Sequence, residues 1–185
     1  MVLGSNHFLG ESALEDFLTG NELTFPEDGI IVSKTDLKGH ITYGNETFFE
    51  IAGYSEHELL GQPHNSIRHP EMPRCVFKLL WDTIQGGNEI FAYVVNQAKN
   101  GDYYWVNAHV TPSFDSNGAV IGYHSNRRVP NRQVITDVIA PLYQALRAEE
   151  RKNGDKKEGT AASTRMLTGI LEEKGIDYER FVHSL

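Results

Sequence analysis

One proline-rich loop of this sequence brings together two histidines and an arginine. The loop covers residues 61–73 and contains His64, Arg68 and His69 among three prolines. The guanidinium of an arginine is always charged and presents its donors in a planar fork, which suits a phosphate or another anion. Farther along, residues 99–106 have the pattern of a hairpin turn that leads into an aromatic strand. Together these segments indicate a small domain with a ligand pocket more clearly than an enzyme.

No other residues form a recognised catalytic or metal-binding pattern. The single cysteine, Cys75, excludes an intrachain disulfide and a metal site built from several thiolates. The eight histidines include no pair with the spacing of a zinc-binding helix. The sequence also lacks a glycine-rich phosphate loop and a nucleophile elbow. We therefore expect no metal site and no enzymatic activity.

The composition indicates a folded protein with an acidic surface. The chain has 185 residues, of which 39% are hydrophobic and 10% aromatic, so it can bury a core. Its formal net charge of −8 argues against nucleic acid as a partner, because phosphates need positive surfaces. No apolar run approaches the ~18–20 residues that span a bilayer, and the N-terminus lacks the features of a signal peptide. We expect a cytoplasmic protein with no membrane span.

The pattern between residues 26 and 130 predicts one α+β domain. Five segments have the composition of strands: residues 30–35, 40–44, 90–98, 103–114 and 119–128. Short helices are predicted between the second and third strands, after Asn45, Ser55 and Pro73. Five antiparallel strands with helices on one face form two layers, and a small ligand can be enclosed between them.

The fourth predicted strand has two distinct faces. Tyr104, Val106, Ala108 and Val110 alternate with a more polar set that includes Trp105. The mostly aliphatic face is expected to point toward the pocket. The face that carries Trp105 would then be the outer one, which terminal helices could cover.

Two flanking segments extend this predicted domain. Residues 1–25 form an N-terminal helical cap with an amphipathic helix at Glu11–Leu18. Residues 131–185 form a C-terminal helical segment, in which an apolar stripe from Val134 to Leu146 is interrupted at Pro141 and residues 151–159 make a charged linker. The stripes predict a homodimer through the terminal helices, with packing back onto the sheet as the open alternative.

Residues 30–128 resemble the PAS domain and, within that family, the PAS module of bacterial aerotaxis receptors. The resemblance is carried by motifs in a particular order: ITYGN at residues 41–45, AGY at 52–54, ELLGQPHN at 58–65, RHPEMP at 68–73, KNGD at 99–102 and YWV at 104–106. It covers just over half of the chain. It implies the PAS fold, with short helices on one face of a five-stranded antiparallel sheet.

The resemblance also implies a cofactor and a function. Its best-known members hold FAD without a covalent bond and report redox, oxygen or energy state to the chemotaxis machinery, so the implied partner is a chemoreceptor or kinase. The implied flavin pocket consists of Asn45, Arg68, His69, Trp81 and Asn96. The residue types agree with that role, because Phe77 and Trp81 can form aromatic walls and Arg68 suits the phosphates.

The sequence departs from this subgroup at several positions. Ile90 and Ala92 stand where the subgroup has Trp and Gly, Gln97 and Ala98 replace two basic residues, and Glu71 replaces an aspartate. We expect the changes at residues 90 and 92 to narrow the pocket. The changes at residues 97 and 98 remove positive charge that a dinucleotide would meet.

Two other functions remain open. The chain could be a cofactor-free PAS module that dimerises through residues 11–18 and 134–146. It could also be a haem-binding gas sensor with His64 or His69 as the axial ligand. Each site residue likewise has a structural alternative: Arg68 and His69 can brace their loop, Asn45 can serve only as a helix cap, and Trp81 can be an ordinary core residue.

Overall fold

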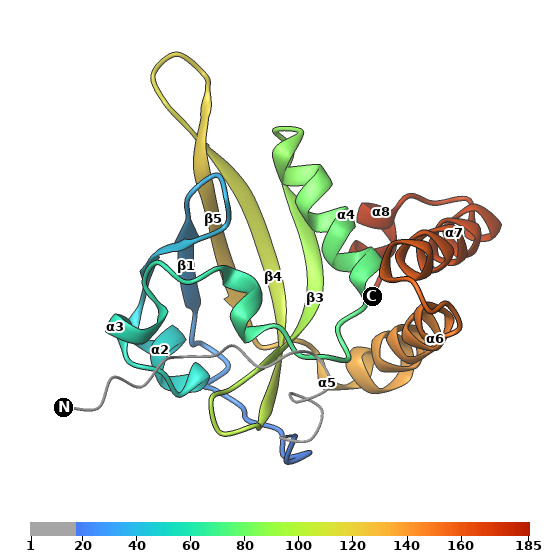
Figure 1. Cartoon of the computed structure of the whole chain (residues 1–185), viewed down its shortest axis with the longest axis horizontal. Helices are drawn as coiled ribbons and strands as arrows, with labels where there is room; N and C mark the ends of the chain where they lie inside the picture. Colours follow the sequence, from blue (N-terminus) through green and yellow to red (C-terminus); the bar gives the residue numbers. More distant parts are fainter. Residues whose placement is uncertain (1–17) are drawn as a thin grey trace.

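A computed structural model describes residues 18–185 of the chain and contains a five-stranded antiparallel sheet (Figure 1). The strands are β1 (Ile31–Thr35), β2 (Ile41–Gly44), β3 (Ile90–Gln97), β4 (Tyr103–Phe114) and β5 (Val120–Arg128). Their order across the sheet is β2-β1-β5-β4-β3, so the first and last strands in sequence become neighbours in the middle. The predicted α+β class and all five predicted strands are confirmed.

Tight turns set the register of the two outer hairpins. Between β1 and β2, the carboxylate of Asp36 accepts from the backbone N–H groups of Lys38 and His40, at 2.9 and 2.8 Å. Gly39 completes this turn with a φ of +83°, which only glycine adopts without strain. Between β3 and β4, Gly101 has a φ of +89°. The Asn-Gly pair therefore forms the hairpin turn that its sequence predicts.

Four short helical elements cover one face of the sheet. They are α2 (Glu46–Ala52), α3 (Glu56–Leu59), the 3₁₀ turn η1 (His64–Ile67) and α4 (Arg74–Gln85). The predicted capping box is present at Ser55, whose backbone N–H donates to Glu58 at 2.9 Å. These elements, coloured cyan to green in Figure 1, form the second layer, with α2 next to β1 and α4 next to β3 and β4.

The main core lies between this helical layer and the sheet. The predicted inner face of β4 is confirmed, because Tyr104, Val106, Ala108 and Val110 are all buried. The buried face of α4 packs above them, with apolar side chains at helical spacing such as Val76, Leu80 and Ile84. Helix α4 therefore covers the space above the inner face of β4.

The C-terminal segment forms a helical unit beside α4 and β3 (Figure 1). It consists of α5 (Arg132–Val134), the π-helical turn η2 (Ile135–Ile139), α6 (Ala140–Arg151), α7 (Lys156–Lys174) and α8 (Tyr178–His183). Pro141 has no N–H for the carbonyl of residue 137, which explains the irregular turn before α6. The predicted linker at residues 151–159 is wrong in its second half, because Asp155 caps α7 by accepting from the N–H of Glu158 at 2.8 Å.

The apolar stripe of the C-terminal segment packs against the sheet. Ile135, Ile139, Tyr143 and Leu146 are buried within the chain. The hydroxyl of Tyr143 donates to the carbonyl of Tyr93 on β3, at 2.5 Å. These four side chains of the stripe are therefore covered by their own chain, as in the packing alternative, whereas Val134, Val138 and Leu142 are half-buried. The predicted helix Glu11–Leu18 lies outside the described residues apart from Leu18, which is in no regular element.

A candidate ligand cavity under helix α4

A narrow cavity lies between α4 and the inner face of β1, β4 and β5. The closed part of the cavity measures about 50 Å³, and the walls border about 580 Å³ when the space that opens to solvent is included. The closed part is smaller than the ~300–1,000 Å³ of ligand pockets, because the walls lie close together. A ring could therefore enter only if α4 moved away from the sheet. Phe77 and Trp81 of α4 form one wall, and Val94 and Ala108 belong to the opposite side.

Four of the six residues predicted to bind a cofactor line this cavity. They are Arg68, Phe77, Trp81 and Asn96. The backbones of Arg68 and Asn96 form an isolated antiparallel bridge, which brings the loop after η1 onto the edge strand β3. The guanidinium of Arg68 lies over the ring of Phe77, 5.0 Å from its centroid, and donates to the carbonyl of Met72 at 2.9 Å. Arg68 therefore braces its loop and also faces the cavity.

The other two predicted residues lie elsewhere. The side-chain oxygen of Asn45 caps α2 at the N–H of Phe48 (3.2 Å) and also accepts from the N–H of Val32 on β1 (2.9 Å). Its amide nitrogen donates to the carbonyl of Ile30 at 2.7 Å. These three bonds occupy the side chain, and Asn45 does not line the cavity. The structure gives it the capping role that the sequence left as the alternative.

His69 points to the opposite side of its extended segment from Arg68, because side chains alternate along such a backbone. Its ring lines a second cleft, between β4 and α6, beside Trp105 and Tyr143. The ring Nδ1 accepts from the backbone N–H of Glu71 at 3.1 Å. Burial lowers the pKa of His69 to about 4, so the ring is neutral at physiological pH. His69 therefore lies next to the C-terminal helices and does not line the cavity under α4.

Arg127 and His64 form a polar centre of the cavity, although the family resemblance places neither of them among the flavin-binding residues. Arg127 on β5 is 4% exposed, and its Nη2 lies 2.8 Å from Ser33 Oγ and 2.6 Å from His64 Nε2. Burial and the charge of Arg127 lower the pKa of His64 to about 3, so the neutral ring accepts from the guanidinium. Burial also lowers the pKa of Arg127, to about 10, which leaves it charged at neutral pH. The alternation of β5, with Tyr123, Ser125 and Arg127 on one face, is the sequence signal that could have located this arginine.

Several buried polar atoms of the cavity have no hydrogen-bond partner among the described residues. They are Asn96 Nδ2, Thr35 Oγ1, Ser125 Oγ and Arg127 Nη1. A buried polar group without a partner costs about 1–3 kcal/mol, more if it is charged. The residues that line the cavity include two arginines and no aspartate or glutamate. The lining of the cavity is therefore electropositive and rich in donors, which suits a ligand with several acceptor atoms or a negative charge.

The substitutions expected to narrow the pocket do not line it. Ala92 and Ile90 are buried on β3, toward the strand's N-terminal end, whereas Val94 and Asn96 of the same strand border the cavity. Phe91 lies on the outer face, where its ring stacks on His109 with the centroids 4.1 Å apart. The expectation that bulk at these positions narrows the pocket is therefore wrong for the described structure.

The part of the chain that the structure describes contains no group of three or more His, Cys, Asp or Glu side chains placed to hold a metal ion. None of its helices combines the length and the apolar character that crossing a membrane would need.

Comparison with known proteins identifies the fold and the relatives of this chain. The family described as PAS fold matches residues 41–127. The aerotaxis receptor of Escherichia coli is 39% identical over 159 residues, which are 86% of this chain and 29% of the receptor. The nitrogen fixation regulatory protein of Klebsiella pneumoniae is 29% identical over 99 residues, 54% of this chain and 20% of that protein. This chain therefore contains a PAS-fold domain, and it spans less than a third of the length of either relative.

Solved structures support the same fold. The structure titled as the light state of the blue-light photoreceptor Aureochrome1 LOV superposes with a TM-score of 0.54 and 23% identity, over 60% of this chain and 89% of that one. The aerotaxis receptor match extends beyond this common domain. A match of 159 residues cannot fit within residues 1–130, so it includes part of the C-terminal helical segment.

Proposed function

We propose that this PAS domain is a sensor that binds a flavin in the cavity under α4 and reports redox or oxygen state to a signalling protein. The relationship to an aerotaxis receptor supports a sensory role. The main observation in favour of a bound ligand is the set of buried polar atoms without partners around the cavity. The residues that line this cavity include two arginines and no carboxylate. A flavin is flat and aromatic, and its ring edge presents several acceptor atoms to such donors.

The residues of the cavity fit this ligand in type. Asn96 and Ser125 would bond to the polar edge of the ring, while Phe77 and Trp81 would contact its faces. Arg68, on the loop at the rim of the sheet, would pair with phosphate, and this supports a phosphorylated flavin such as FAD. A bound flavin supplies one- and two-electron redox chemistry, and charge near its ring tunes that chemistry. Arg127 would favour added negative charge on the ligand.

We propose FAD as the flavin and a separate chemoreceptor or kinase in the cytoplasm as the partner. The haem alternative is less well supported by the geometry, because the Nε2 of His64 already contacts Arg127 and Ser33, and His69 lies outside the cavity. The cofactor-free alternative leaves the unpartnered donors of the cavity without an explanation. The same experiment decides among the three.

The test is the visible spectrum of the purified chain, followed by titration with FAD, FMN and riboflavin. We expect the two-band flavin spectrum, bleached by dithionite, and binding by Arg127→Gln that is weaker by about tenfold or more for all three flavins. Arg128→Gln is the matched control, because Arg128 is the next residue of β5 and is exposed on the other face. Arg68→Gln should weaken FAD and FMN but leave riboflavin binding unchanged.

Three results would contradict the proposal. A colourless protein that binds none of the flavins would favour the cofactor-free module, and a Soret band would favour haem. Equal losses in Arg127→Gln and Arg128→Gln would show that Arg127 does not contact the ligand. Urea unfolding of each variant separates weaker binding from a loss of fold.

A further inference from the structure

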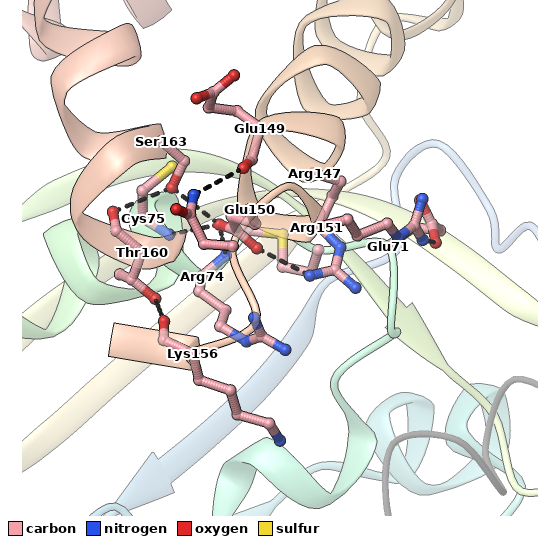
Figure 2. A network of polar contacts seen from close by, with 12 residues as sticks. Glu71, Arg74, Cys75, Arg147, Glu149, Glu150, Arg151, Lys156, Thr160 and Ser163 are labelled. Carbon is pink, nitrogen blue, oxygen red and sulfur yellow. Dashed lines mark hydrogen bonds and ion pairs between the residues drawn. The ribbon is translucent and has the colours of Figure 1, made fainter. Parts of the chain in front are cut away.

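Helix α4 begins without a capping side chain of its own. Its N-cap residue is Pro73, which has no side-chain acceptor, so the first N–H groups of α4 need partners from elsewhere. Glu150 of α6 provides them: its Oε1 accepts from the backbone N–H of Arg74 at 2.7 Å and of Cys75 at 3.2 Å (Figure 2). The cap of a helix in the PAS domain therefore comes from the C-terminal segment.

Glu150 is also the centre of a buried polar cluster. The residue is 1% exposed, its Oε2 accepts from Arg147 Nη1 at 2.8 Å, and its Oε1 accepts from Ser163 Oγ of α7 at 3.0 Å. A carboxylate at a helix N-terminus is favoured by the helix dipole, and the arginine balances its charge. Figure 2 shows Glu150 between Arg147 on one side and Ser163 on the other. One side chain thus holds α4, α6 and α7 together.

The backbones of α6 and α7 approach closely at the same place. A Cβ atom added to Gly159 would lie 2.5 Å from the carbonyl oxygen of Glu150, closer than atoms can approach. Gly159 is therefore required for α7 to reach the cluster. Any side chain at this position would push α7 away from Glu150 and lengthen the bond from Ser163.

The helix that Glu150 caps is also the wall of the cavity. Phe77 and Trp81 line the cavity, one and two turns after the capped N–H groups. Cys75 and Val76, in the first turn, are buried. A helix moves as a rigid rod over such a distance. A shift at its first turn would therefore displace the aromatic wall.

We propose that Glu150 is a positioning residue of the cavity and that it couples docking of the C-terminal helices to the occupant of the cavity. A docked segment holds α4 in place and preorganises the aromatic wall for the ligand. Because such coupling is reciprocal, loss of the ligand loosens the contact of α6 and α7 with α4. The C-terminal segment thereby becomes the part of the chain that reports the state of the cavity. The identity of the ligand in this inference rests on the proposed function, whereas the coupling through α4 rests on the contacts of Glu150.

The first experiment compares Glu150→Gln with Glu149→Gln in a Trp105→Phe background, where Trp81 is the remaining tryptophan. Gln keeps an oxygen for the N–H groups of α4 but loses the charge that pairs with Arg147. Glu149 precedes it in the same helix and pairs at the surface with Lys152, so its loss should have little effect. We expect Glu150→Gln to speed hydrogen exchange in the first turn of α4, raise quenching of Trp81 by acrylamide, and weaken FAD binding by about fivefold or more.

A second variant tests the coupling without any change of charge. Gly159→Ala replaces a glycine inside a helix, a change that by itself favours helix formation. If α7 must reach Glu150, this variant should nevertheless raise the quenching of Trp81 and weaken FAD binding, as Glu150→Gln does. Gly169→Ala is the matched control, because a Cβ at Gly169 in the same helix meets nothing within 4 Å.

The outcomes separate this inference from the proposed function. If the unmodified chain binds no flavin, the proposed function fails, and hydrogen exchange and Trp81 quenching still decide the coupling. Faster exchange confined to α6 and α7, with Trp81 and flavin affinity unchanged, would show that Glu150 is only a local cap and would overturn the inference. A response of Glu149→Gln or Gly169→Ala equal to that of its partner variant would also overturn it.

Discussion

Acid should destabilise this protein through His64, and the effect can be isolated by one substitution. His64 is held neutral in the folded chain, because burial and the neighbouring charge of Arg127 lower its pKa from 6.5 to about 3. In the unfolded chain the ring has its ordinary pKa and takes up a proton as the pH falls below 6.5. The unfolded state then binds more protons than the folded state. The free energy of unfolding therefore decreases as the pH is lowered from 6.5 to about 3.

The magnitude follows from the two pKa values. Each pH unit below the unfolded pKa costs about 1.4 kcal/mol for one such group, so His64 should remove at most about 2 kcal/mol of unfolding free energy at pH 5 relative to pH 7.5. Domains of this size are stable by about 5–15 kcal/mol, so a change of that size is measurable. His69, with its pKa lowered to about 4 by burial, acts in the same direction. The drop in the unmodified chain therefore exceeds the share of His64 alone.

The assay is urea unfolding at pH 7.5 and pH 5.0, followed by tryptophan fluorescence and circular dichroism. We expect His64→Gln to lose about 2 kcal/mol less than the unmodified chain between these two conditions. His57→Gln, at an exposed position of α3, controls for a histidine-to-glutamine change as such. An equal loss in the His64→Gln variant and the unmodified chain would refute the reasoning, because His64 would then not be held neutral by its surroundings.

Two further predictions concern residues whose roles changed between sequence and structure. Asn45→Ala should destabilise the fold by about 2–3 kcal/mol in urea, since it removes the cap of α2 and both bonds to the β1 segment, and it should leave riboflavin affinity within about twofold. A loss of affinity without a loss of stability would instead support a role in the ligand site. Leu146→Asp should destabilise the chain by at least about 3 kcal/mol, because it places a charge at a fully buried position. A halved mass in light scattering with unchanged stability would instead support the dimer predicted from the stripe.

The strands and turns were predictable because their signals are local. The Asn-Gly pair at residues 100–101 requires positive φ, and the alternation along β4 identifies its buried face without knowledge of its neighbours. The same holds for the capping box at Ser55, where donor and acceptor are three residues apart. Such features depend on neighbouring residues, and they appear in the structure close to where the sequence places them.

The polar centre of the cavity was less predictable because it depends on contacts between distant elements. Arg127, Ser33 and His64 come from β5, β1 and η1, and no spacing in the sequence reveals that they meet. Asn45 and His69 match the family's motif, but in the described structure they make local contacts and do not line the cavity. A motif indicates which loop approaches the cavity. The backbone bridge between Arg68 and Asn96 of β3 decides that the side chain of Arg68, and not that of His69, faces the cavity.

Because Glu150 caps α4, the sheet and its helical layer depend on a residue of the C-terminal segment. A fragment that ends near residue 130 would contain every strand of the PAS sheet, but it would leave the first N–H groups of α4 without their acceptor. It would also expose the outer side of β3 and β4, where Tyr143 and Phe181 now share one continuous core with the sheet. We therefore expect such a fragment to be less stable than the chain that extends through α8, and recombinant work should retain the C-terminal segment.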